Sequence, residues 1–251
     1  MGYWRGPGPD PHFPYLTEDE RLSFPDPEHC EDWIVAVGGN LSPGMLLSAY
    51  EQGIFPWYNP EDPLIWQSPD PRFVIYPETL HISESMRKLF KKRLFTIRFD
   101  TNFEEVIHGC GSVPRPGQGG TWITQDIIQA YTALHRLGWA HSAEAYLDGE
   151  LVGGCYGIRL GNVFCGESMF ARYPNASKAA FLTLAKNLFN DGIAFIDCQV
   201  PTSHLRSLGG QELDRSSFLR LLKKALSVRD TLGRDTADRR GSWAGRYTEI
   251  Q

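Results

Sequence analysis

Three consecutive strand-like segments in the middle of the chain constrain its fold more than any other feature. They span residues 141–149, 150–161 and 162–170, and the turn dipeptides Asp-Gly and Gly-Asn join them. Turns this short connect antiparallel strands, because a parallel pair needs a crossover of about a dozen residues. Segments with helical periodicity precede and follow the three strands. The order therefore predicts an α/β protein with a mixed sheet rather than a doubly wound parallel one.

The texture of the sequence divides the chain into three parts. Most of the 17 prolines lie before residue 78, and the helix expected there begins at Pro43 behind Ser42 as its N-cap. We therefore expect a small α+β domain over residues 1–72, a larger domain over 73–228, and a polar, disordered tail over 229–251. In the larger domain we expect further strands at residues 73–77, 94–100 and 193–201, and helices at 83–93, 102–110, 124–138, 175–192 and 214–226.

The composition is typical of a protein from a reducing compartment that has no general affinity for polyanions. The chain of 251 residues has a net charge of −5, so nucleic acid would have to bind through a local basic patch. Its five cysteines are odd in number and contain no CxxC pair, which indicates free thiols. No apolar run approaches the roughly 20 residues of a membrane span. The first residues, MGYWRGPGPDP, are too polar for a signal peptide. We expect a cytoplasmic protein without a membrane partner.

Polar side chains interrupt the apolar strand FIDCQVP, residues 195–201. Asp197 and Gln199 stand two apart, so on a pleated strand they leave by one face, and Cys198 leaves by the other. A carboxylate and an amide in such a strand cost free energy unless they have partners. They either satisfy backbone groups at the end of the strand or act together in a functional site.

Six sequence blocks, long and in a fixed order, resemble those of one family. They are PWYNPEDPLIWQSPDPR, GTWIT, HSAEAYLDGELVGGCYG, VFCGESMFARYPNASK, IDCQV and SLGG. From about residue 34 to residue 222 the chain resembles the leucyl/phenylalanyl-tRNA–protein transferases. The resemblance implies a GCN5-related acyltransferase-like catalytic domain behind a small N-terminal domain. The order of predicted elements matches that layout too. The segment ARYPNASK has no glycine-rich phosphate loop, which disfavours coenzyme A as the acyl donor.

The resemblance also implies an activity. The family transfers Leu or Phe, and Met weakly, from aminoacyl-tRNA to the α-amine of proteins that begin with Arg or Lys, which marks them for degradation. It uses no metal and no coenzyme. Aminoacyl-tRNA is an activated ester, so its aminolysis needs only orientation, loss of one proton and stabilisation of the oxyanion. We expect a monomer, since nothing in the sequence indicates an obligate oligomer.

The positions that match the family's catalytic pair are Asp197 and Gln199. Gln199 would contact the amine or the ester, and Asp197 would orient it and carry charge. Glu167 would accept the substrate's N-terminal amine or basic side chain, because a site that selects Arg or Lys is negative. The alternative for Glu167 is a structural ion pair with Arg172 or Lys178.

The resemblance further implies a pocket for the transferred amino acid. A short cysteine at the start of its lining indicates a roomier pocket than a methionine would leave. The lining would consist of Cys155, Phe164, Met169, Phe181, Leu184, Leu188 and Ile196. The stripe of Phe181, Leu184 and Leu188 can equally be plain helix core.

Aromatic and basic residues would hold the tRNA. Trp57 and Trp122 match tryptophans that stack on the 3′-terminal adenosine, with Tyr131 as a weaker third contact. The alternative is packing between the two domains. Five cations between residues 87 and 93 would contact tRNA phosphates, although such a run is usually a solvated helix face. They are Arg87, Lys88, Lys91, Lys92 and Arg93.

Other functions remain as alternatives. They are an amine acyltransferase with a different donor, a transferase for acidic N-termini, and a non-catalytic module that binds tRNA or peptide. A nucleophilic cysteine is disfavoured, because Cys198 is expected to face away from Asp197. The candidate nucleophiles are Cys198 and Cys165, each with His204 or His141 as its base.

Overall fold

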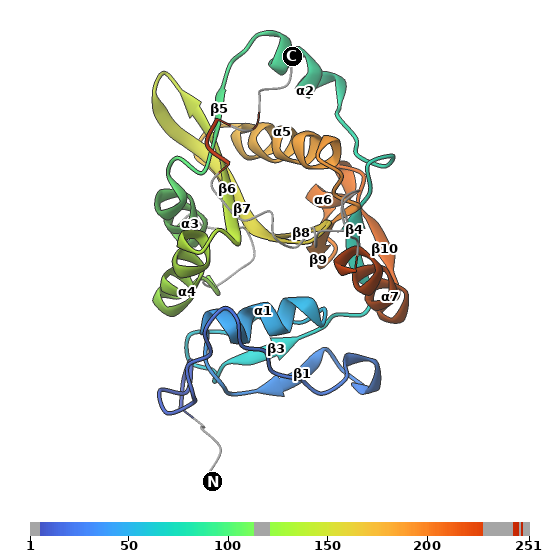
Figure 1. Ribbon diagram of the computed structural model, residues 1–251. Coiled ribbons are helices and arrows are strands. Elements are labelled where there is room, and N and C mark those ends of the chain that lie inside the picture. The colour runs from blue at the N-terminus through green and yellow to red at the C-terminus, as the bar shows by residue number, and fades with distance from the viewer. Residues whose placement is uncertain (1–5, 113–120, 228–242, 246, 248–251) are drawn as a thin grey trace.

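The computed structural model describes residues 6–112, 121–227, 243–245 and 247, and it contains two sheets (Figure 1). The smaller sheet has the order β1-β3-β2 and is antiparallel. Its strands are β1 (Ile34–Val37), β2 (Phe55–Pro56) and β3 (Ile65–Gln67). All three strands come from the N-terminal part of the chain.

The larger sheet has seven strands in the order β10-β4-β9-β8-β7-β6-β5. Among these strands the β8–β9 pair is parallel and the other neighbouring pairs are antiparallel. This confirms the prediction of a mixed α/β sheet, including the three strands joined by short turns. The strands are β4 (Arg72–Ile75), β5 (Thr96–Phe99), β6 (Ala140–Leu147), β7 (Glu150–Leu160), β8 (Val163–Ala171), β9 (Phe195–Gln199) and β10 (Gln211–Leu213).

Side-chain caps begin three of the six predicted helices. The hydroxyls of Ser83 and Thr124 and the carboxylate of Asp214 accept backbone N–H groups in the first turns of α2, α4 and α7. Ser42 precedes Pro43 as expected, but its hydroxyl donates to Asn40 Oδ1 instead of capping the helix. The helices are η1 (Pro27–His29), α1 (Pro43–Glu51), α2 (Glu84–Lys91), α3 (Phe103–Ser112), α4 (Gln125–Arg136), α5 (Ala176–Asn190), α6 (Ser203–Ser207) and α7 (Arg215–Leu226). No helix in the described ranges is long and apolar enough to cross a bilayer.

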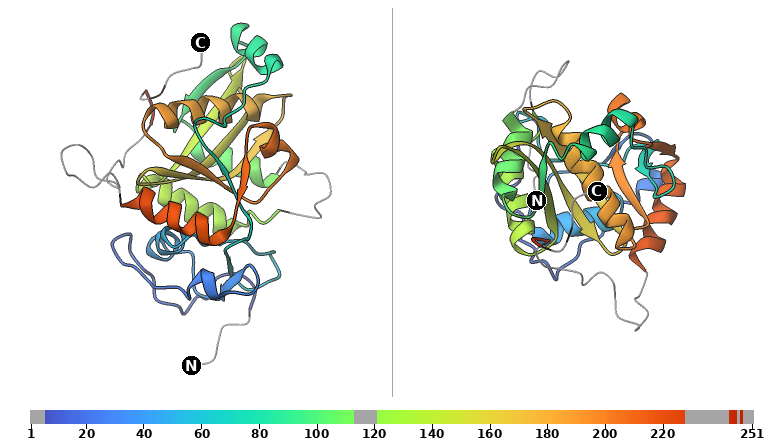
Figure 2. Two further views of the ribbon diagram at one scale, coloured as in Figure 1. Left: turned by 90° about the vertical axis from the view of Figure 1, so that its right-hand side faces the viewer. Right: turned by 90° about the horizontal axis from the view of Figure 1, so that it is seen from above.

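The large sheet is covered on both faces (Figures 1 and 2). Helix α5 packs on one face in a core with Ile97, Phe164 and Ile196. Helices α3, α4 and α7 cover the other face, together with α1 and the small sheet. Leu46 of α1 and Phe218 of α7 belong to this second core, so the N-terminal segment and the large sheet share apolar packing. The domain boundaries expected at residues 72 and 228 stay a prediction.

The tail expected over residues 229–251 lies mostly outside the described residues. Trp243 is described and is fully buried, and its backbone N–H donates to Asp100 Oδ2 over 2.7 Å. At this position the expectation of a disordered tail is wrong. A polar composition does not reveal that one aromatic side chain of the segment packs into the hydrophobic core.

Candidate active site

A cavity of about 530 Å³ opens where β8 and β9 separate. The two strands pair only from Val163 to Cys165 and from Phe195 to Asp197. Beyond these residues β8 continues along β7, and β9 continues along β4. Residues of both strands then line the cavity together with residues 55–57 of the N-terminal segment. This volume is typical of a small-molecule site.

Gln199 ends β9 and contributes a polar group to the cavity. Its side-chain Nε2 donates to Glu167 Oε1 over 2.9 Å. Its backbone has a φ of +65°, in the left-handed region that is costly for a residue with a side chain. The backbone N–H donates to Asp197 Oδ1 over 2.9 Å, which holds this conformation.

Asp197 lies behind Gln199 and does not line the cavity. Its carboxylate forms a bidentate ion pair with Arg72, in which the Nε–Oδ1 distance is 2.9 Å and the Nη2–Oδ2 distance is 2.7 Å. Both side chains are 1% exposed. Arg72 also donates to the carbonyl of Gly53 and lies 4.4 Å from the centre of the Phe218 ring. The carboxylate is thus fully engaged as a buried counter-ion.

Arg72 is a site residue that the sequence interpretation missed. The predicted strand began one residue later, at Phe73, whereas β4 begins at Arg72. An arginine at the start of such an apolar strand is a usable signal, because a buried guanidinium requires a carboxylate partner. The signal does not identify the partner, which is 125 residues away.

Glu167 on β8 faces Gln199 and a pair of tyrosines. Its Oε2 accepts from the Tyr131 hydroxyl over 3.2 Å, and that hydroxyl shares a very short hydrogen bond with Tyr50. Burial raises the pKa of Glu167 to about 8. Hydrogen bonds from Tyr50 and Tyr131 act against this rise, and the charge of Asp197 adds to it. The alternative of an ion pair with Arg172 is wrong, because that arginine lies against Glu105.

The structure places four of the seven expected amino-acid-pocket residues on the cavity: Cys155, Phe164, Met169 and Phe181. Leu184, Leu188 and Ile196 are fully buried and do not line it. The apolar stripe of α5 packs against the sheet along the helix. Of its three residues, only Phe181, which lies nearest the start of the helix, lines the cavity. Leu184 and Leu188 have the core position that was the alternative.

Cys198 also lines the cavity, contrary to the expectation that it turns away from the site. The cavity extends to both sides of β9 at its end, so a residue on either face can reach it. Burial raises the pKa of the Cys198 thiol far above its ordinary value, so the thiol is protonated at neutral pH. His204 lines the same cavity, and burial lowers its pKa. A thiol with this pKa is a poor nucleophile.

The aromatic residues expected at the adenosine site separate into two groups. Trp57 and Trp122 line the cavity and are partly exposed, and Trp57 stacks on Trp33 with ring centres 6.4 Å apart. Tyr131 is fully buried beneath Glu167, so its expected contact with a nucleobase is wrong. Its hydroxyl donates a hydrogen bond to Glu167 instead.

The basic cluster lies away from the cavity. All five of its residues are exposed on α2 and the turn that follows, and none of them lines the cavity. They are Arg87, Lys88, Lys91, Lys92 and Arg93. Their contact with tRNA stays a prediction.

Comparisons with known proteins point to one family. Residues 74–223 match the family described as leucyl/phenylalanyl-tRNA protein transferase, and residues 39–70 match its N-terminal domain. The leucyl/phenylalanyl-tRNA–protein transferase of Myxococcus xanthus is 48% identical over 231 residues, which cover 91% of this chain and 95% of that protein. The enzyme of the same name from Nitratidesulfovibrio vulgaris is 48% identical over 88% of this chain and 94% of its own. A GCN5-related N-acetyltransferase from Kribbella flavida superposes with a TM-score of 0.36 and 14% identity, over 68% of this chain and 60% of that one.

Proposed function

Because the chain belongs to the leucyl/phenylalanyl-tRNA–protein transferase family, we propose that its cavity between β8 and β9 is where an aminoacyl group passes from tRNA to a protein. The chain is accordingly an aminoacyltransferase. The finer proposal is transfer of Leu or Phe to the N-terminal α-amine of proteins that begin with Arg or Lys. It is supported by one juxtaposition, in which apolar residues and the Glu167–Gln199 pair line a single cavity.

The apolar end of the cavity suits the transferred side chain. Cys155, Phe164, Met169 and Phe181 offer sulfur, aliphatic and aromatic surface and no charge. An apolar pocket of this kind favours Leu or Phe, because a polar side chain would lose its water without gaining a partner. Cys155 in particular leaves room for a ring.

Glu167 and Gln199 suit the reacting groups. The α-amine attacks the ester carbonyl, the new C–N bond forms, and the C–O bond to the ribose breaks with the proton passing to the leaving oxygen. We propose that Glu167 accepts a hydrogen bond from the amine and that Gln199 orients the amine and ester. Asp197 is paired with Arg72, so we propose that it acts by holding the Gln199 backbone and not by taking the proton.

The charge of the site bears on the choice of protein substrate. The ionised form of Glu167, which a bound cation stabilises and which forms as pH rises toward its pKa of about 8, attracts a cationic N-terminal residue and repels an acidic one. This favours Arg and Lys over Asp and Glu as the first residue.

We further propose how the enzyme holds tRNA. Trp57 and Trp122 stack on the 3′-adenosine, and the basic cluster on α2 contacts phosphates. We also propose that the enzyme acts as a monomer in the cytoplasm, where aminoacyl-tRNA is available.

A transfer assay tests the proposal. The protein is incubated with labelled Phe-tRNA and peptides that are identical except for a first residue of Arg, Lys, Asp or an acetylated Arg. We expect label on the Arg and Lys peptides alone, and Glu167→Gln to reduce that preference. Equal labelling of the Asp peptide contradicts the proposed acceptor. Transfer of acetyl from acetyl-coenzyme A, with none from tRNA, contradicts the proposed donor.

A further inference from the structure

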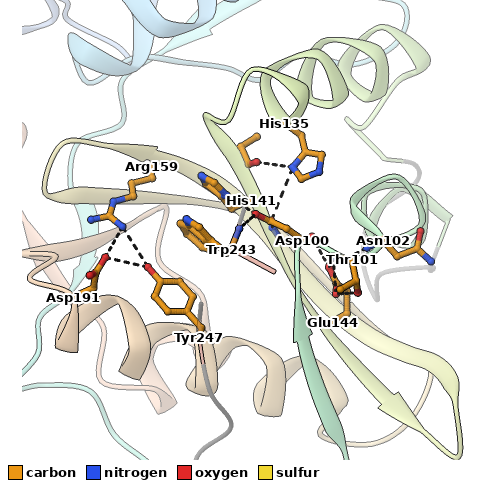
Figure 3. A network of polar contacts seen from close by, with 12 residues as sticks. Asp100, Thr101, Asn102, His135, His141, Glu144, Arg159, Asp191, Trp243 and Tyr247 are labelled. Atoms are coloured by element: carbon orange, nitrogen blue, oxygen red, sulfur yellow. Dashed lines mark hydrogen bonds and ion pairs between the residues drawn. The ribbon is translucent and has the colours of Figure 1, made fainter. Parts of the chain in front are cut away.

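Trp243 packs against the back of the proposed amino-acid pocket. Its ring centre lies 5.9 Å from that of Phe164, and it is stacked on His141 at 3.7 Å with the planes 3° apart. Figure 3 shows Trp243 beside His141, between Asp100 and the group formed by Arg159, Asp191 and Tyr247. Trp243 lies outside residues 74–223, the segment that matches the family.

Phe164 is confined from a second direction by Gly157 on β7. A Cβ atom at Gly157 would lie 2.6 Å from Cζ of Phe164 and 2.2 Å from the carbonyl oxygen of Cys165. The ring of Phe164 therefore lies directly over this glycine, with Trp243 as a second neighbour. Because Phe164 also lines the cavity, its position sets how deep the apolar end is.

The indole acts through its shape. Neither Nε1 of Trp243 nor Nε2 of His141 has a hydrogen-bond partner among the described residues. Tyr247 helps to hold the indole in place, with ring centres 5.0 Å apart and its hydroxyl donating to Asp191 Oδ2 over 3.2 Å. Replacing the indole by a phenyl ring thus removes bulk but no hydrogen bond of the ring.

We infer that Trp243 is a specificity-determining positioning residue: by holding Phe164 in place it limits the depth of the amino-acid pocket and so the balance between Leu and Phe. The inference rests on the proposed function, because it requires that Phe164 borders the transferred side chain. Without the indole the ring of Phe164 has space to withdraw. The deeper pocket then accommodates Phe better relative to Leu.

Internal competition tests the inference with the full-length chain. Equal concentrations of Leu-tRNA and Phe-tRNA, each with its own label, compete for one Arg-starting peptide. The ratio of the two products equals the ratio of the two kcat/KM values and does not depend on how much of a variant is folded. The variants are Trp243→Ala, Trp243→Phe, Phe164→Ala, the Trp243→Ala/Phe164→Ala double variant, and Tyr247→Phe as a matched control.

A single methylene in an apolar pocket is worth roughly tenfold or more. Trp243 acts on the pocket only through the ring of Phe164, so we expect Trp243→Ala to have a smaller effect and to raise the Phe-to-Leu product ratio by about threefold or more. Trp243→Phe removes part of the bulk, so its ratio is expected to lie between those of the wild-type protein and Trp243→Ala. Tyr247→Phe keeps the ring that contacts the indole and is expected to stay close to the wild-type ratio. The double variant is expected to match Phe164→Ala, because the indole then has no ring to hold.

Three results would overturn the inference in distinguishable ways. An unchanged ratio in Trp243→Ala, with a changed ratio in Phe164→Ala, shows that Trp243 is merely structural and leaves the proposed function standing. An unchanged ratio in both shows that Phe164 does not border the transferred side chain, which refutes the pocket as well. Absence of any product from the wild-type protein refutes the proposed function itself.

Discussion

Removing the carboxylate of Asp197 is expected to destabilise the protein strongly as well as to slow transfer. Asp197→Ala leaves Arg72 charged and 1% exposed without its counter-ion. Breaking such a buried pair costs about 3–5 kcal/mol. Arg72 keeps its bond to the Gly53 carbonyl and its contact with the Phe218 ring, so we expect the lower end, about 3 kcal/mol. For a chain of this length that is a fall in Tm of roughly 6–12 °C.

A double-mutant cycle separates the charge effect from simple loss of packing. Arg72→Met combined with Asp197→Ala removes both charges and keeps an aliphatic chain in place, so it is expected to be more stable than Asp197→Ala alone. The matched control is Glu104→Ala. Its pair with Arg136 has an N–O distance of 2.8 Å, close to that of Arg72 and Asp197, but the side chains are 72% and 58% exposed. We expect it to change stability by less than about 1 kcal/mol.

Denaturant unfolding followed by circular dichroism, with thermal unfolding in parallel, measures the free energy of unfolding of five proteins: the wild type, Asp197→Ala, Arg72→Met, the double variant and Glu104→Ala. The reasoning is refuted if Asp197→Ala is no less stable than the Glu104→Ala control. It is also refuted if the loss of unfolding free energy in the double variant equals the sum of the losses in Asp197→Ala and Arg72→Met, because the two charges are then not coupled.

The remaining predictions concern the pH profile and the tRNA. The pKa of Glu167 is raised to about 8, so its carboxylate ionises as pH rises through that value. We therefore expect kcat/KM for an Arg peptide to increase through this range; Glu167→Gln should leave only the increase that comes from the substrate amine. The Lys91→Ala/Lys92→Ala double variant is expected to bind all tRNAs more weakly, by the same factor, and to show a smaller salt dependence of binding. An unchanged affinity refutes the phosphate contact. Trp57→Ala is expected to cost about 1–3 kcal/mol in binding of aminoacyl-tRNA, and to have no effect on a tRNA that lacks the terminal adenosine.

Much of the secondary structure could be predicted because its signals are local. The antiparallel strands predicted from the short turns between residues 141 and 170 are confirmed, and Ser83 and Thr124 cap the helices that they were predicted to cap. The aromatic and β-branched residues that follow the turn signal NDG also predict β9. They do not predict the left-handed backbone of Gln199, which depends on an oxygen of Asp197 in that position.

The candidate site could be predicted in part. Sequence blocks named Glu167, Gln199, Trp57 and Trp122, and the structure places all four on one cavity. They could not separate the α5 residue that reaches the cavity from those that lie deeper in the same stripe. That distinction depends on where β8 and β9 part, which is a property of the sheet and not of the helix.

The sequence by itself determined the elements, the mixed sheet and the family, because turns, caps and periodicity act between near neighbours and family blocks are contiguous. Only the tertiary structure decided what each polar or aromatic side chain does. Arg72 neutralises Asp197 from 125 residues away, Tyr131 is buried beneath Glu167, and Trp243 returns from the C-terminal segment to pack on Phe164. The physical reason is that burial and pairing depend on which distant segments pack together, and no local pattern records that choice.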